Sequence, residues 1–236
     1  MSAHIGDIVG CLEGLPEVQK CARLYKVQFV GTHGTGKSTL VSNTETILVK
    51  HGVVPVRPIR ELSQRFSDTG VSLNEKTTLD AQVAVLTQQT AEELLYRERG
   101  FNIVTDRSVA DNFAYALLAF EKRPEYIASG VLERLHEMVR LFSGYAPASH
   151  TFFVPLVNGK LVEDGVRSVN EYFQHAADSR IEELMDANGT RHYRLPIVAE
   201  RSRNVWLSLV ERTLFPDLPD DKYFEPAPPE VVLGSY

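Results

Sequence analysis

The sequence contains little cysteine and lacks a long hydrophobic run. Two cysteines, Cys11 and Cys21, are too few for a disulfide framework or a zinc site, which favours a reducing compartment. No apolar stretch reaches the length of a membrane span, and the N-terminus lacks the pattern of a secretory signal. We therefore expect a cytoplasmic protein with no membrane partner. The excess of acidic over basic residues, 31 against 25, argues against non-specific attraction to nucleic acid.

The length and composition of the chain are typical of an ordinary soluble globular protein. With 236 residues, 43% of them hydrophobic and 24% charged, it is large enough for one main domain with a full core. We expect this domain at residues 25–215, after an N-terminal extension at 1–24 and before a proline-rich tail at 216–236. The protein is expected to be a monomer or a homodimer.

One short segment carries most of the functional information. Residues 31–39 read Gly-Thr-His-Gly-Thr-Gly-Lys-Ser-Thr and match the phosphate-binding spacing G-x-x-x-x-G-K-[ST]. The β-branched and aromatic run at 25–30 predicts a strand before the motif, and apolar positions at helical spacing in 40–49 predict a helix after it. Because strand, loop and helix come in the order that this motif needs, a chance glycine turn before a buried helix is the weaker interpretation.

Each residue type in the motif has a physical reason. Gly31, Gly34 and Gly36 allow backbone N–H groups to surround an anion, and the start of the helix adds partial positive charge. Lys37 can reach the outer phosphates as a catalytic residue, and the hydroxyl of Ser38 can ligate Mg²⁺. We therefore expect ATP and Mg²⁺ as cofactors, bound by Gly31, Thr32, His33, Gly34, Thr35, Gly36, Lys37, Ser38 and Thr39.

Strands alternate with helices along the rest of the chain. Besides the strand at 25–30, β-branched and aromatic runs predict strands at 53–59, 101–105, 151–156 and 192–197. Helical periodicity predicts helices at 77–99, 109–121, 125–142, 169–186 and 199–214. This alternation is typical of an α/β three-layer sandwich, with a five-stranded parallel sheet and helices on both faces. In such folds ligands bind beyond the carboxyl ends of the strands.

Asp106, Arg107 and Ser108 follow the predicted third strand. A carboxylate at this position is typical of a Mg²⁺-associated acid or a general base, so Asp106 is a candidate for catalysis and for the metal site. The alternative role for Asp106 is the N-cap of the helix at 109–121, for which Ser108 is an equally good candidate. Arg107 is a candidate for binding a second substrate, with a salt bridge to Asp111 as the alternative.

Two further segments are expected on the acceptor side. Arg60 and Glu61 follow the second strand, where Arg60 would bind an anion and Glu61 a hydroxyl group. For Glu61 the alternative is a first-turn acid that stabilises a helix N-terminus. The polar loop at about 157–168 is expected to be a lid whose Arg167 takes part in catalysis, with Arg180 as a further substrate-binding residue. A solvated surface loop is the alternative for this segment.

Four segments resemble those of nucleoside and nucleotide kinases of the P-loop class: residues 31–39, Arg60-Glu61, Asp106-Arg107-Ser108 and the loop at 164–167. The resemblance is to thymidylate-kinase-like and deoxynucleoside-kinase-like enzymes. It implies a P-loop NTPase fold, MgATP, and phosphate transfer to a nucleoside, a nucleotide or a related hydroxyl group. Similar bacteriophage kinases act on 5-hydroxymethyluracil within DNA, and the loop also resembles ATPase domains linked to ribosylnicotinamide phosphorylation. The sequence departs from thymidylate kinases at Thr32-His33, where these usually carry an acid, and at Ser108, where they carry an aromatic residue.

The leading hypothesis is therefore an ATP-dependent kinase with a small nucleoside or nucleotide as acceptor. A first alternative is a kinase acting on a modified base within DNA or on a polynucleotide end, which the acidic net charge disfavours. A second alternative is a nucleotide-dependent switch or regulatory ATPase. Against it, the sequence lacks the N-K-x-D guanine reader of GTPases, and Arg107 follows Asp106 where ring-forming ATPases carry a paired Asp-Glu.

Overall fold

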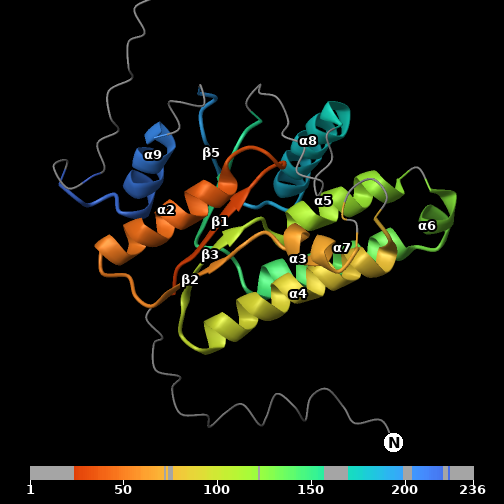
Figure 1. The fold of residues 1–236 in the computed structure, drawn as a ribbon, viewed down its shortest axis with the longest axis horizontal. Coiled ribbons are helices and arrows are strands. Elements are labelled where there is room, and N and C mark those ends of the chain that lie inside the picture. The colour runs from red at the N-terminus through yellow and green to blue at the C-terminus, as the bar shows by residue number, and fades with distance from the viewer. Residues whose placement is uncertain are drawn as a thin grey trace, which may run out of the picture.

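The structure is a computed structural model that describes residues 24–71, 73, 77–121, 123–156, 170–198, 204–219 and 223. In these residues, five parallel strands form one sheet in the order β2-β3-β1-β4-β5 (Figure 1). The strands are β1 (Lys26–Val30), β2 (Val56–Ile59), β3 (Asn102–Asp106), β4 (His150–Phe153) and β5 (Tyr193–Arg194). The expected five-stranded parallel sheet is confirmed.

Helices cover both faces of this sheet (Figure 1). One face carries α2 (Lys37–Lys50) and α9 (Asn204–Leu214). The other face carries α4 (Leu79–Glu98), α5 (Val109–Phe120), α7 (Val131–Tyr145) and α8 (Glu171–Ala187). Two short helices, α3 (Ser63–Asp68) and α6 (Pro124–Ala128), lie in the connections. The three-layer arrangement is therefore present as well.

The strands contribute alternate residues to the two cores. Val27 and Phe29 of β1 belong to the core beneath α2 and α9, together with the fully buried Trp206 of α9. Val30 belongs to the core on the other face, with Phe113 of α5. Complete burial of one such side chain stabilises the fold by about 1.5–3 kcal/mol. The two cores therefore fix β1 between the helix layers, and with it the start of the loop that follows.

The register of the sheet brings the functional strand ends together. β1 pairs with β3 and β4, and Phe29 lies opposite Asp106 in the parallel ladder. β3 also pairs with β2, where Ile59 lies opposite Thr105. Because the strands are parallel, the segments that follow β1, β2 and β3 leave from the same edge of the sheet. The phosphate-binding motif and the two charged segments therefore meet at this edge.

Three local features differ from the prediction or decide between its alternatives. A single helix is expected at 125–142, but Gly130 adopts a left-handed conformation with φ 64° and separates α6 from α7. A strand is expected at 192–197, but only the two residues of β5 pair with β4. Ser108 is the N-cap of α5, since its hydroxyl oxygen accepts a hydrogen bond from the backbone N–H of Asp111. The capping role considered for Asp106 is therefore wrong.

Three expected regions lie wholly or largely outside the described residues: the extension at 1–24, the lid at about 157–168 with Arg167, and the tail at 216–236. Their boundaries stay predictions. In the part of the chain that the structure describes, no helix combines the length and the apolar character needed to cross a membrane.

Candidate functional site

The phosphate-binding motif forms a tight loop between β1 and α2. Gly31, Gly34 and Gly36 have φ values of 132°, 76° and 93°, which L side chains rarely adopt. Gly31 also has no room for a side chain, because a Cβ atom there would lie 2.5 Å from the backbone oxygen of Val154. Thr39, at the end of the motif, is exposed in the first turn of α2. The glycines of the motif are therefore required by the path of the backbone.

Lys37 points back into this loop. Its Nζ donates a hydrogen bond to the backbone oxygen of Thr32 and lies 3.3 Å from Thr35 Oγ1. Burial and the nearby Arg107 lower the pKa of the ammonium group from 10.5 to about 8, although Asp106 opposes this shift. A triphosphate in the loop offers this ammonium group charged oxygen atoms in place of a neutral backbone oxygen.

Ser38 and Asp106 lie next to each other where α2 begins and β3 ends. The hydroxyl of Ser38 donates a hydrogen bond of 2.5 Å to Asp106 Oδ2, and the buried Oδ1 has no partner among the described residues. Mg²⁺ prefers oxygen ligands and commonly takes only one or two carboxylates, completing its shell with phosphate oxygens and water. The pair fits such a site. The described residues contain no cluster of three or more His, Cys, Asp or Glu side chains that could hold a metal by themselves.

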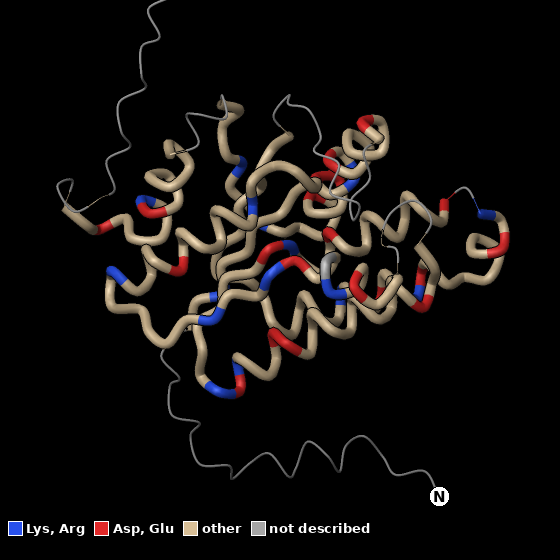
Figure 2. Tube along the Cα trace, viewed as in Figure 1, with Lys and Arg blue, Asp and Glu red and all other residues tan. Residues whose placement is uncertain are grey.

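Arg107, which directly follows Asp106, forms a largely buried ion pair with Glu61. Acidic and basic residues gather where the strands end, near the centre of Figure 2. Arg107 Nε and Nη2 donate hydrogen bonds of 2.9 and 2.7 Å to Glu61 Oε1. Nη1 of the same guanidinium is buried and has no partner in the described part of the chain. The salt bridge between Arg107 and Asp111, considered from the sequence, is therefore replaced by one to Glu61.

Asp111 instead connects α5 to the phosphate loop. Its Oδ2 accepts a hydrogen bond of 3.1 Å from the backbone N–H of Gly31, and its Oδ1 accepts one of 3.0 Å from the Ser108 hydroxyl. Burial raises the pKa of this carboxyl from 3.8 to about 6, although Arg107 and Lys37 oppose the shift. This contact is not evident from the sequence, where Asp111 resembles an ordinary first-turn acid.

Tyr115 lies one turn beyond Asp111 on the same face of α5. Its hydroxyl accepts a hydrogen bond of 3.1 Å from the backbone N–H of His33, and it lies 3.2 Å from Thr32 Oγ1. Its ring packs against Arg107, whose Cζ is 4.7 Å from the ring centroid. Sequence reasoning missed Tyr115 because an aromatic residue at helical spacing is usually part of the core. The sequence does contain one signal for this position: Tyr115 lies four residues after Asp111, which places both side chains on the same face of a helix.

Two side chains of α8 hold the loop from another side. Gln174 Nε2 donates a hydrogen bond of 2.8 Å to the backbone oxygen of His33. Burial raises the pKa of the Asp178 carboxyl, and the nearby backbone N–H of Thr32 opposes this shift. Neither position was predicted. Side chains of α5 and α8 therefore both contact the loop, and the two helices share one hydrophobic core.

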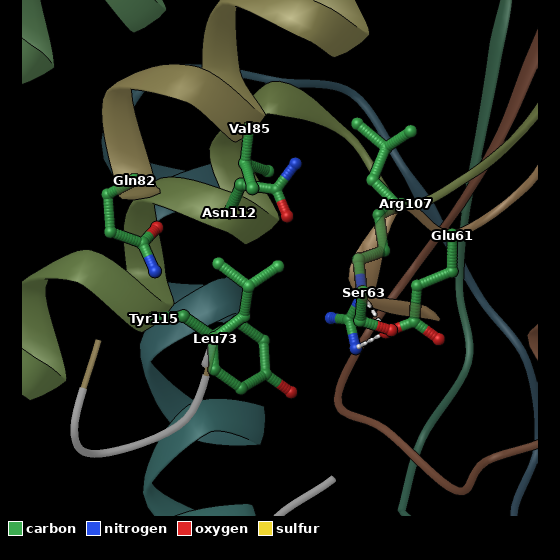
Figure 3. A pocket seen from close by; sticks show the side chains of 9 residues that line it. Glu61, Ser63, Leu73, Gln82, Val85, Arg107, Asn112 and Tyr115 are labelled. Atoms are coloured by element: carbon green, nitrogen blue, oxygen red, sulfur yellow. Dashed lines mark hydrogen bonds and ion pairs between the residues drawn. The ribbon is translucent and has the colours of Figure 1, made fainter. Parts of the chain in front are cut away.

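A small cavity adjoins the ion pair (Figure 3). Figure 3 shows Arg107 and Glu61 joined at one side of it, and the amide groups of Gln82 and Asn112 at the other. Its volume is about 40 Å³, enough for a hydroxyl group or one to two water molecules. The lining residues are Glu61, Leu62, Ser63, Leu73, Gln82, Val85, Arg107, Asn112 and Tyr115.

Two residues expected to bind substrate lie away from this cavity. Arg60 is exposed, and its Nη1 lies 3.4 Å from the hydroxyl of Ser42 on α2. Arg180 pairs at 3.2 Å with Glu121, which directly follows α5. Glu121 lies six residues beyond Tyr115, which lines the cavity, so this pair is about 9 Å from Tyr115 along the axis of α5. Neither Arg60 nor Arg180 lines this cavity, so their role in binding substrate stays a prediction, and Arg167 lies outside the described residues.

Comparisons with known proteins agree with this architecture. Residues 26–203 match the sequence profile of a family described as AAA domain, whereas the comparison with curated proteins gave no match. A deoxyadenosine kinase from M. mycoides with bound dATP has a similar fold, with a TM-score of 0.57 and 15% identity over 80% of this chain and 98% of the kinase. The NadR protein in complex with NAD and AMP-PNP gives a TM-score of 0.53 and 17% identity, over 73% of this chain.

These solved structures share little sequence with this chain, and the NadR protein is much longer than the part that matches. This chain spans 44% of the NadR protein, so it corresponds to less than half of that molecule. A likeness at 15–17% identity shows the fold alone. The family profile, in contrast, covers most of the chain, including the loop at 31–39 and Asp106-Arg107-Ser108. The chain therefore belongs to the AAA-domain family and has the fold of a P-loop NTPase.

Proposed function

We propose that this protein is an ATP-dependent kinase that transfers the γ-phosphate to the hydroxyl group of a nucleoside-like acceptor. The observation that carries the proposal is the buried Glu61–Arg107 pair, which lies at a cavity beside the Ser38–Asp106 pair. A phosphate-binding loop by itself serves a regulatory switch equally well. A carboxylate at an adjacent cavity adds what a kinase needs, a second substrate site with a proton acceptor.

On the nucleotide side, the loop N–H groups and Lys37 bind the triphosphate. Ser38 and Asp106 would hold Mg²⁺, which would supply neutralising charge at the phosphate oxygens. The hydrogen bond between these two residues already keeps their oxygen atoms together, so little rearrangement is needed. Nucleotide binding draws Lys37 away from Thr32, because its ammonium group exchanges a neutral partner for a charged one.

On the acceptor side, Glu61 takes up the proton of the acceptor hydroxyl while the hydroxyl oxygen forms a bond to the γ-phosphorus. The bond between this phosphorus and the β–γ bridging oxygen breaks, and ADP leaves with the electron pair. Arg107 holds Glu61 through two hydrogen bonds and favours its ionised form. The Arg107 Nη1 group can then donate to an oxygen atom of the transferred phosphoryl group.

Charge at the cavity favours a neutral acceptor over a nucleotide. Arg107 is the one cation among the described lining residues, and Glu61 compensates its charge. A nucleotide acceptor brings further negative charge, and these lining residues hold no second cation to bind it. The cavity volume of about 40 Å³ has room for the reacting hydroxyl group of either acceptor, so the choice between them follows from charge. A nucleoside therefore fits the site better than a nucleotide does.

The test is a transfer assay with labelled ATP, Mg²⁺ and a panel of nucleosides, nucleotides and duplex DNA containing 5-hydroxymethyluracil. We expect a labelled nucleoside, and we expect Glu61→Gln to lower kcat by about 10²- to 10⁴-fold. The matched control is Glu92→Gln, since Glu92 forms an ion pair with Arg65 at the surface. Label on the DNA alone favours the modified-base alternative. Nucleotide-dependent assembly without transfer to any acceptor favours the regulatory switch.

A further inference from the structure

The hydroxyl of Tyr115 binds the first half of the phosphate loop at several atoms. It accepts a hydrogen bond of 3.1 Å from the backbone N–H of His33. It also lies 3.0 Å from His33 Nδ1 and 3.2 Å from Thr32 Oγ1, so its own proton has an acceptor in the loop. Only 8% of Tyr115 is exposed, and hydrogen bonds in such surroundings fix geometry more firmly than they do in water.

The ring of the same residue supports the acceptor side. The Arg107 guanidinium lies over this ring, 4.7 Å from its centroid, while it donates two hydrogen bonds to Glu61. A desolvated contact between a guanidinium group and an aromatic face is attractive and restricts where the guanidinium lies. Tyr115 also lines the cavity next to Glu61. A displacement of Arg107 therefore changes its contact with the Tyr115 ring, and the hydroxyl of this ring is hydrogen-bonded to the loop.

One side chain thus touches both halves of the site. We propose that Tyr115 is a positioning residue that couples the phosphate loop to the Glu61–Arg107 pair, so that a change on the acceptor side alters nucleotide affinity. The assignment of these two halves rests on the proposed function. The physical connection is short and continuous: loop backbone, Tyr115 hydroxyl, Tyr115 ring, Arg107 and Glu61.

The experiment is a double-mutant cycle on the affinity for Mg-AMP-PNP, measured by calorimetry on the full chain. The four proteins are wild type, Tyr115→Phe, Glu61→Gln and the double variant. Tyr115→Phe removes the hydroxyl but keeps the ring, and Glu61→Gln frees Arg107 from its charged partner. We expect the factor by which Glu61→Gln changes Kd to differ by about threefold or more between the two backgrounds. A purely electrostatic effect of the lost charge is the same in both backgrounds and cancels in the cycle.

Two controls make the result specific. Tyr96→Phe is the matched variant, since the ring of Tyr96 packs against Phe101 far from the loop, and its cycle with Glu61→Gln should be additive. If Tyr115→Phe is poorly folded by circular dichroism, Thr32→Val replaces it, because this change removes a loop hydroxyl that lies against Tyr115. Equal Kd factors in both backgrounds overturn the proposal, as does a Kd that Glu61→Gln leaves unchanged.

The cycle also separates this inference from the proposed function. It uses an ATP analogue and no acceptor, so it gives a result whether or not the transfer assay identifies a substrate. If the protein phosphorylates a nucleoside but the mutant cycle is additive, the proposed kinase activity stands and the proposed coupling through Tyr115 is wrong. A non-additive cycle without transfer to any acceptor retains the coupling and contradicts the kinase.

Discussion

Binding of MgATP at alkaline pH should be accompanied by the uptake of a proton at Lys37. Burial and the charge of Arg107 lower the pKa of this lysine to about 8 in the nucleotide-free protein. A triphosphate that reaches the ammonium group stabilises its charged form, so the pKa rises again in the complex. The neutral fraction of Lys37 must therefore take up a proton when nucleotide binds.

The expected amount follows from the pKa of about 8 in the free protein. About half of the molecules carry a neutral lysine at pH 8, about 90% at pH 9 and about 3% at pH 6.5. If the complex restores the ordinary value of 10.5, binding takes up about 0.5 proton at pH 8 and about 0.9 at pH 9. By linkage the affinity at pH 9 is about fivefold weaker than at pH 8.

Calorimetry in two buffers of different ionisation enthalpy measures this uptake directly, because the difference in heat gives the number of protons. The matched variant is Lys37→Arg, which keeps a positive charge that does not titrate in this range. The variant should show no uptake at pH 8 and pH 9, where the carboxyl of Asp111 is almost fully ionised. Equal heats in both buffers at pH 9 for the wild type would refute the reasoning, since Lys37 would then take up no proton when the nucleotide binds.

Three further predictions concern stability and the two arginines that do not line the cavity. The pKa of Asp111 is about 6 in the folded protein against 3.8 in a free side chain, so the folded state binds more protons between these pH values. The unfolding free energy should therefore fall by about 2 kcal/mol from pH 4 to pH 7 relative to Asp111→Asn, measured by urea unfolding; parallel curves would contradict this. Gly31→Ala should lower Tm and prevent MgATP binding, because the new Cβ atom meets the Val154 oxygen at 2.5 Å; an unchanged Tm would disprove the clash. Arg60→Ala and Arg180→Ala should each keep kcat/KM within about threefold in the transfer assay, because both side chains lie away from the cavity. A tenfold loss in either variant would return that arginine to the substrate site.

The sequence predicts the local features of this protein well. Residues 31–39 match a motif of fixed spacing, and each glycine in them occupies a position whose positive φ angle L side chains rarely adopt. The role of Ser108 as N-cap depends on an atom only three residues away, and it too was open to prediction. Gly130 was overlooked because the residues on both sides of it continue a helical pattern, and a glycine can lie within a helix or end one.

Contacts between distant segments could not be predicted in the same way. Glu61 and Arg107 are 46 residues apart, and the choice between Asp111 and Glu61 as partner depends on how β2 and β3 pair. The contact between Tyr115 and His33 joins residues that are 82 positions apart in the sequence. The lowered pKa of Lys37 results mainly from burial, and the spacing of residues in a sequence motif does not reveal how deeply a side chain is buried.

A crystal structure with Mg-AMP-PNP tests the central claim most directly. We predict that the nucleotide lies in the loop at 31–39, that Lys37 Nζ leaves the Thr32 oxygen for a phosphate oxygen, and that a metal ion contacts Ser38 and lies beside Asp106. A loop without nucleotide at saturating concentration, with Lys37 still bound to the Thr32 oxygen, would contradict the account.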